Sequence, residues 1–152
     1  MGRVYVDALL VRAAEEARRA GSRTMEAEHV LLALAAEPDG DVAEVLGAAG
    51  LDYQGVQDAL RREFEHGLGT AGISIDDEDV LRPRAARRQP SDIGESGRFV
   101  LEQAMGTVRK RDMRAPHLLL GILELKVGTV PRALDLAGVD VEGLKARTRA
   151  LL

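Results

Sequence analysis

The chain contains no cysteine and no tryptophan among its 152 residues. The lack of cysteine excludes disulfides, thiolate metal sites and a cysteine nucleophile, and it fits a reducing compartment. Aromatic residues account for only 3% of the chain, although 45% of it is hydrophobic. Small and aliphatic apolar residues without aromatics favour tight packing of helices over a β-rich architecture. We therefore predict an all-α protein.

Long apolar runs and a surplus of positive charge are also missing. No apolar stretch approaches the length of about 20 residues that a transmembrane helix needs, and the first ten residues lack the features of a signal peptide. The formal net charge is −4 and the pI is near 5.4, so no global positive field attracts phosphate backbones. We expect a cytoplasmic protein that binds neither membranes nor nucleic acid.

Apolar residues recur at helical spacing in two parts of the chain. The first part predicts four helices, with Asp41 and Asp52 as N-caps, at residues 4–20, 26–37, 42–49 and 53–65. The second part predicts four more, with Asp140 as an N-cap, near 95–109, 115–125, 130–137 and 141–151. Between them, residues 66–93 lose the periodicity and carry an acidic block followed by a basic block. We interpret them as a solvated linker, although the two blocks could fold back on each other or engage a partner.

The two parts are copies of one unit. The segment from Met25 to Leu34 aligns with the segment from Met113 to Ile122, and Met, Ala, His and two Leu positions are identical. The same spacing pairs Gly50 with Gly138. Upstream the alignment is ambiguous by about one helical turn, which is consistent with a fifth helix shorter than the first.

This repeat predicts the architecture. We expect one domain of eight helices, arranged as two four-helix repeats at residues 4–65 and 94–152. The repeats should pack about a pseudo-twofold axis, because each covers the apolar surface that the other cannot bury alone.

The duplicated segment resembles the repeat of the N-terminal domains of Clp-family ATPases of the ClpA and ClpC type, whose signature reads Ile-Gly-Thr-Glu-His-Leu-Leu-Leu-Gly-Leu. Residues 42–46 and 130–134 are similar to the next helix of that family. The resemblance covers both repeats and implies the double Clp N-terminal fold. No G-x-x-x-x-G-K-[ST] motif occurs in the sequence, so the cradle for nucleotide phosphates is missing. The sequence thus resembles a stand-alone copy of this domain without the AAA+ modules.

The resemblance implies a non-catalytic, monomeric binding domain of the Clp protease system that needs no cofactor. Its partners would be a Clp ATPase, a Clp adaptor, degradation substrates or peptide-like small molecules, and it could deliver proteins or compete with the ATPase's own N-terminal domain. The alternative is a DNA-binding transcriptional regulator, which the short helices and the basic residues 82–88 would suggest. An enzyme is not expected, because the histidines and carboxylates form no recognisable catalytic constellation.

The resemblance also implies a binding site. Some Clp N-terminal domains bind phosphorylated arginine through the acidic residue before the motif histidine, which corresponds to Glu28, with Glu26 and Arg114 as further candidates. The matching position in the second repeat is Pro116, so two symmetric phosphoarginine pockets are not expected. The alternative for Glu28 is a first-turn carboxylate that the helix dipole stabilises.

His29 and His117 occupy matching positions at the starts of two predicted helices. A catalytic base needs a nucleophile and an orienting acid, and a metal site needs further ligands, neither of which the sequence pattern supplies. We therefore expect both imidazoles to be structural and to bond backbone groups at the helix start. No catalytic residue and no metal ligand is predicted.

Overall fold

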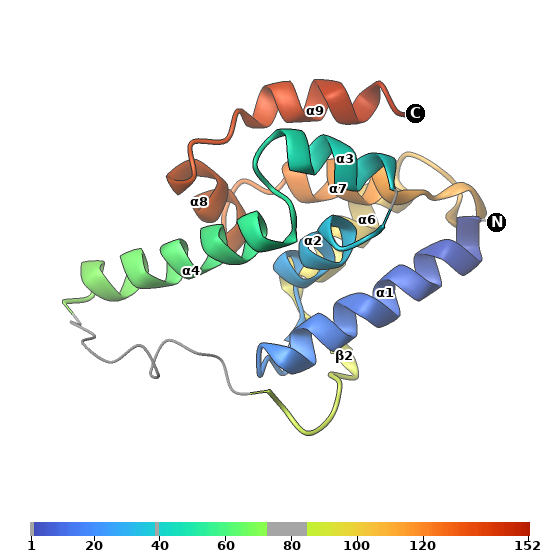
Figure 1. Cartoon of the computed structure of the whole chain (residues 1–152). Coiled ribbons are helices and arrows are strands. Elements are labelled where there is room, and N and C mark those ends of the chain that lie inside the picture. Colours follow the sequence, from blue (N-terminus) through green and yellow to red (C-terminus); the bar gives the residue numbers. More distant parts are fainter. Residues whose placement is uncertain (1, 39, 73–84) are drawn as a thin grey trace.

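The computed structural model describes residues 2–38, 40–72 and 85–152. Within this part of the chain there are eight α-helices and two short strands (Figure 1). The first half contains α1 (Gly2–Arg19), β1 (Thr24–Met25), α2 (Ala27–Ala35), α3 (Asp41–Ala48) and α4 (Tyr53–Thr70). The second half contains β2 (Asp92–Ile93), α6 (Glu95–Met105), the 3-10 helix η1 (Lys110–Asp112), α7 (Ala115–Leu123), α8 (Thr129–Leu136) and α9 (Val141–Arg149).

The two halves pack in a reciprocal way. Helix α1 packs on α2 as α6 packs on α7, and α2 and α7 contact each other at the centre. Helix α4 then packs against α8 of the other half, as α9 packs against α3 (Figure 1). Exchanging the halves leaves these contacts unchanged. The predicted all-α fold of two four-helix repeats with pseudo-twofold symmetry is therefore confirmed.

The central helices are apolar nearly all round because they are covered on most sides. The core includes Leu34, Leu46, Leu118 and Leu119, each fully buried. Such helices gain their stability from burial rather than from helix propensity. The helices outside them, such as α4, keep charged residues on their exposed face.

The predicted N-caps at Asp52 and Asp140 are confirmed. The Asp52 carboxylate accepts a hydrogen bond from the Gly55 N–H at 2.7 Å, and the Asp140 carboxylate accepts one from the Gly143 N–H at 3.0 Å. Each cap of this kind stabilises a helix by about 1 kcal/mol. The prediction for Asp41 was wrong, since Gly40 is the N-cap and Asp41 lies in the first turn of α3, where the helix dipole favours a carboxylate.

Two predicted boundaries are also corrected. Helix α4 continues to Thr70, past residue 66, where the linker was expected to begin, because glycines cost a helix only about 1 kcal/mol each and no proline intervenes. Helix α6 ends at Met105 rather than near residue 109, with Gly106 as its C-cap. It has 11 residues against 18 in α1, which agrees with the ambiguous register of the repeat. The acidic block and part of the basic block lie outside the described residues.

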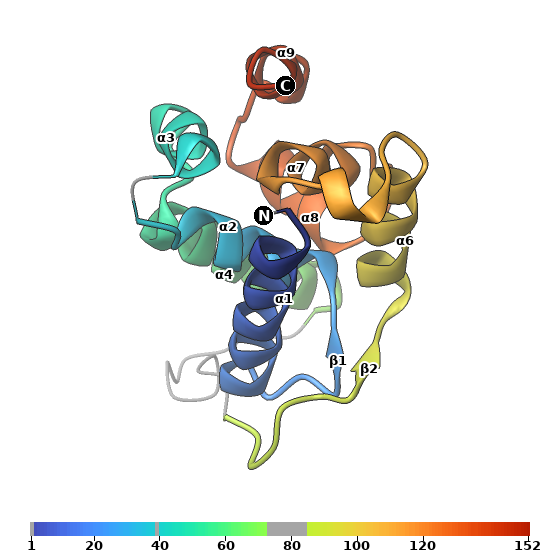
Figure 2. The same cartoon turned by 90° about the vertical axis from the view of Figure 1, so that its right-hand side faces the viewer.

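A parallel ladder between β1 and β2 joins the halves near the start of α2 and α6 (Figure 2). It pairs Thr24 with Asp92 and Met25 with Ile93, and it is too short to leave a sequence pattern. Just before it, the end of the predicted linker docks on α1. The Ala86 N–H donates to the Arg18 carbonyl at 2.7 Å, and the Arg18 guanidinium donates to the Ala86 carbonyl at 3.1 Å.

Candidate binding groove

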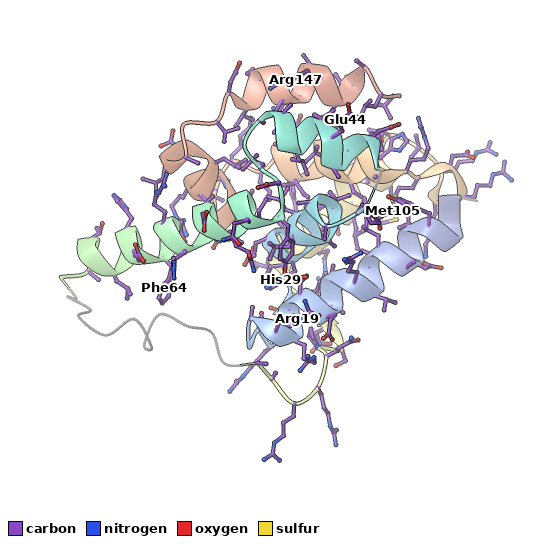
Figure 3. The ribbon with its side chains drawn as sticks, in the orientation of Figure 1. Arg19, His29, Glu44, Phe64, Met105 and Arg147 are labelled. Carbon is purple, nitrogen blue, oxygen red and sulfur yellow. The ribbon has the colours of Figure 1, made fainter. Side chains whose placement is uncertain are left out.

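A hollow lies between the C-terminal end of α1, the N-terminal half of α2 and the face of α4. We call it the α1–α2–α4 groove. Its volume is about 990 Å³, at the upper end of the usual range for ligand sites. Figure 3 shows Arg19, His29 and Phe64, one from each helix, on the same side of the molecule. Its lining includes Glu16, Arg19, Glu28, His29, Leu32, Tyr53, Asp58, Leu60, Arg61, Glu63 and Phe64.

The groove has an apolar part. Leu32 is buried beneath it, Leu60 is half-buried, and Phe64 is 50% exposed. The half-exposed ring leaves apolar area in contact with water on the wall of a concave surface. The groove therefore offers apolar contact area to a ligand.

Glu28 lies in the first turn of α2 and its side chain is half-buried in the groove wall. Burial raises the pKa of its carboxyl, and the negative charges of Glu26 and Glu63 add to the rise. A hydrogen bond from its own backbone N–H lowers the pKa, but desolvation outweighs this bond. None of the ion pairs among the described residues involves Glu28. The result is a partly desolvated carboxylate that faces the groove without a cation.

A second carboxylate, Glu16 on α1, forms the back of the groove and is only 6% exposed. The Tyr53 hydroxyl on α4 donates to both of its oxygens, at 2.9 and 2.8 Å, and an Arg19 nitrogen lies 3.8 Å away. These contacts tie α4 to α1. Sequence analysis missed Glu16, although it falls seven positions after Leu9 and three after Ala13, on the core-facing side of α1.

The groove is acidic overall. Glu16, Glu28, Asp58 and Glu63 line it against only two arginines, Arg19 and Arg61. Both arginines are already paired, Arg19 with Glu15 at 3.5 Å and Arg61 with Glu65 at 3.9 Å. Of the acids, Glu63 is paired with Arg132 of α8 at 2.9 Å. Glu28 and the exposed Asp58 are left without a cation within the described residues.

Glu26, the second predicted site residue, does not line the groove. Its carboxylate accepts hydrogen bonds from the Ser96 hydroxyl at 2.7 Å and the Ser96 N–H at 3.3 Å, and from the Thr24 hydroxyl. Burial raises the pKa of this carboxyl, but the bonds from Thr24 and Ser96 outweigh burial and the net shift is downward. A Cβ on Gly94 would overlap the Glu26 carboxylate, so a larger residue there would displace this side chain. Glu26 fastens α2 to α6.

The two motif histidines make the same hydrogen bond in the two repeats. His29 Nδ1 accepts from the Glu26 N–H at 2.9 Å, and His117 Nδ1 accepts from the Arg114 N–H at 2.9 Å. Each imidazole thus satisfies a backbone donor at the start of its helix, which would otherwise lack a partner. Burial lowers the pKa of His29 to about 4 and also lowers that of His117, so both rings are neutral near pH 7.

The second repeat holds no counterpart of the groove's free acid. Arg114 is exposed at the start of α7, and its guanidinium lies 3.5 Å from the Leu151 carbonyl. Pro116, which replaces the acid, is buried. The structure therefore does not bring Arg114 together with Glu28, and of the three predicted binding residues only Glu28 lies in the groove.

Clusters of metal-binding side chains and membrane-spanning helices are both absent from the described residues. In that part of the chain, no group of three or more histidine, aspartate or glutamate side chains could hold a metal ion. None of the helices described is long and apolar enough to cross a membrane.

Comparisons with known proteins agree with this fold. The family model of the Clp repeat (R) N-terminal domain matches residues 5–87, which is 83 of the 152 residues. The N-terminal domain of the caseinolytic protease associated chaperone ClpD from Arabidopsis thaliana superimposes with a TM-score of 0.62 at 19% identity, over 93% of this chain and 88% of that one. At this identity the likeness shows the fold alone.

Curated relatives match at higher identity. The chloroplastic chaperone protein ClpC1 of Oryza sativa subsp. japonica is 28% identical over 142 residues, which cover 91% of this chain and 14% of the relative. A homologue of ClpA, the ATP-binding subunit of an ATP-dependent Clp protease, from Cyanidium caldarium is 29% identical over 138 residues, with 91% and 15% covered. The chain thus spans about a seventh of the length of these relatives.

Proposed function

Because the chain belongs to the Clp repeat (R) N-terminal domain family, we propose that it is a non-catalytic binding domain of a Clp protease system. It would bind degradation substrates, adaptors or peptide-like small molecules, and it could compete for them with the N-terminal domain of a Clp ATPase. The observation that carries this proposal is the α1–α2–α4 groove, whose Glu28 carboxylate forms no ion pair with any residue that the structure describes.

The position of Glu28 supports a role in binding rather than in stability. A carboxylate whose pKa is raised in the folded protein lowers the free energy of unfolding at neutral pH. Glu28 is such a group, so the fold gains nothing from its charge. Charged groups that cost stability are typical of binding and active sites. Glu26, in contrast, has its hydrogen bonds within the fold and is proposed as a structural residue.

The cellular location and the oligomeric state of the protein are not tested by these observations. A cytoplasmic location stays a prediction, since the matched relatives include chloroplastic proteins. The monomeric state also stays a prediction. The DNA-binding alternative has no observation in its favour: Arg87 and Arg88 are exposed, but they follow a segment docked on α1 and lie on no recognition helix.

The direct test is isothermal titration calorimetry of the purified chain with three partners: a Clp ATPase, a Clp adaptor and a permanently unfolded substrate protein. We expect binding to at least one of them, weakened in the Glu28→Gln variant. The matched control is Glu44→Gln, which removes the same charge from the exposed face of α3, away from the groove (Figure 3). Absence of heat with all three partners, for a chain whose circular dichroism shows it to be folded, would refute the proposed function.

A further inference from the structure

The α1–α2–α4 groove follows the face of α4. Its lining residues on that helix run from Tyr53 to Phe64, a length of about 16 Å at the rise of an α-helix. An extended peptide covers this distance with about five residues. The groove therefore has the length of a short peptide segment and is longer than the site of a single small ion.

Its lining combines two kinds of chemistry. Leu60 and the half-exposed ring of Phe64 offer apolar contact. Beside Glu28, carboxylates dominate, and in the described chain neither Glu28 nor Asp58 is part of an ion pair. A ligand that complements both the carboxylates and the apolar residues carries a cationic side chain next to an apolar one.

Binding of a phosphate group in the same groove is unfavourable. Helix N-termini attract phosphate through free N–H groups, but at the start of α2 the Ala27 N–H already donates to the Ser96 hydroxyl at 2.9 Å. The Glu26 N–H donates to His29. The two guanidiniums that line the groove are paired with carboxylates, so a phosphate would have to break those pairs while facing a net negative surface.

Resting on the proposed binding function, we infer that the α1–α2–α4 groove selects an extended peptide segment with an unmodified arginine or lysine beside an aliphatic or aromatic residue, and disfavours phosphorylated arginine. Glu28 accepts hydrogen bonds from the cationic head, and Phe64 packs on the apolar neighbour. A guanidinium suits this acceptor best, because its fork of donors can reach both carboxylate oxygens.

The test uses three fluorescein-labelled nonapeptides that differ only at the central residue, which is arginine, citrulline or phosphoarginine, flanked by leucines. Citrulline keeps the shape of arginine and removes its charge. Fluorescence anisotropy measures the affinities at about 50 mM and about 150 mM salt, since screening weakens exposed ion pairs over this range. The proteins are wild type, Glu28→Gln, Phe64→Ala and the Glu44→Gln control, each checked by circular dichroism and urea unfolding.

We expect the arginine peptide to bind about tenfold more tightly than the citrulline peptide, the ratio for one charge-assisted hydrogen bond, and more tightly than the phosphoarginine peptide. Glu28→Gln should remove most of the preference for arginine over citrulline. Phe64→Ala should weaken all three peptides about equally, and Glu44→Gln should change nothing.

Three results would overturn the inference. Tighter binding of the phosphoarginine peptide than of the arginine peptide would show that the groove prefers the modified residue. The domain would still be a peptide-binding domain. Equal affinities for the arginine and citrulline peptides would show that the positive charge of the ligand does not contribute to binding. No binding of any peptide up to about 1 mM, together with heat in the calorimetric test against an adaptor or the ATPase, would refute the peptide groove and leave the proposed function standing.

Discussion

The buried imidazole of His29 makes the stability of the fold depend on pH in a calculable way. The ring is 3% exposed, and burial lowers its pKa from 6.5 to about 4. Its Nδ1 accepts the Glu26 N–H, so a protonated ring would lose this bond as well as its solvation. Between the two pKa values the unfolded chain binds a proton that the folded chain does not. The free energy of unfolding therefore falls as the pH is lowered through this window.

The magnitude follows from the two pKa values. Between pH 7 and pH 5, a group with pKa 6.5 unfolded and about 4 folded lowers the free energy of unfolding by about 2 kcal/mol. The comparison variant is His29→Gln. Glutamine does not titrate, and at this helix position its side-chain oxygen can accept the same N-cap N–H, as in a capping box. All other titrating groups, including His117, are common to both proteins and cancel in the difference.

The assay is urea unfolding of both proteins at pH 7, 6 and 5, followed by circular dichroism at 222 nm. We expect wild type to lose about 2 kcal/mol relative to the variant between pH 7 and pH 5. If the difference between the two proteins stays constant within about 0.5 kcal/mol, the scatter of ordinary substitutions, then His29 is not buried as a neutral acceptor and the reasoning is refuted.

Four further predictions concern the site and the packing. Glu28→Gln should leave the free energy of unfolding at pH 7 unchanged or higher, because the raised pKa means that its charge destabilises the fold; a clear loss in urea unfolding would contradict this. Binding of the arginine peptide should also decline on acidification at a higher pH than for an ordinary glutamate, since protonation removes the acceptor charge. Tyr53→Phe should cost about 1 to 3 kcal/mol by leaving the buried Glu16 carboxylate without its donor, and an unchanged urea midpoint would show that water replaces the hydroxyl. Gly121→Ala should cost about 1 to 3 kcal/mol, because its Cβ would lie 2.7 Å from a carbonyl oxygen of α6, whereas Gly47→Ala, with nothing within 4 Å, should stabilise α3 by up to about 1 kcal/mol; equal effects in thermal unfolding would argue against the close packing of α6 on α7.

Local chemistry explains what could be predicted from the sequence. The caps at Asp52 and Asp140 depend on a short polar side chain and an N–H three residues later, so spacing alone finds them. The repeat predicted the pseudo-twofold packing because equivalent apolar faces require equivalent partners. Glu28 was found from its place in the repeated motif rather than from any property of the groove.

The rest of the groove could not be read from the sequence, because it depends on contacts between distant residues. Tyr53 and Glu16 are 37 positions apart, and Glu26 and Ser96 are 70 apart. No local pattern connects such pairs. The one available signal was Glu16 itself, a charged residue at a core-facing position of an amphipathic helix, which predicts a buried partner. The extension of α4 to Thr70, beyond which the chain loses its helical pattern, was hidden by glycines that usually mark loops.

Binding of the ligands of a Clp ATPase through the α1–α2–α4 groove can be tested by competition. The most direct measurement is displacement of a fluorescein-labelled unfolded substrate from the isolated N-terminal domain of a Clp ATPase by increasing amounts of this chain. We expect displacement by wild type and by Glu44→Gln, and a need for about tenfold more of Glu28→Gln, the loss expected for one charge-assisted hydrogen bond. Failure of the folded wild-type chain to displace the substrate at any concentration, or displacement by Glu28→Gln with wild-type potency, would contradict this expectation.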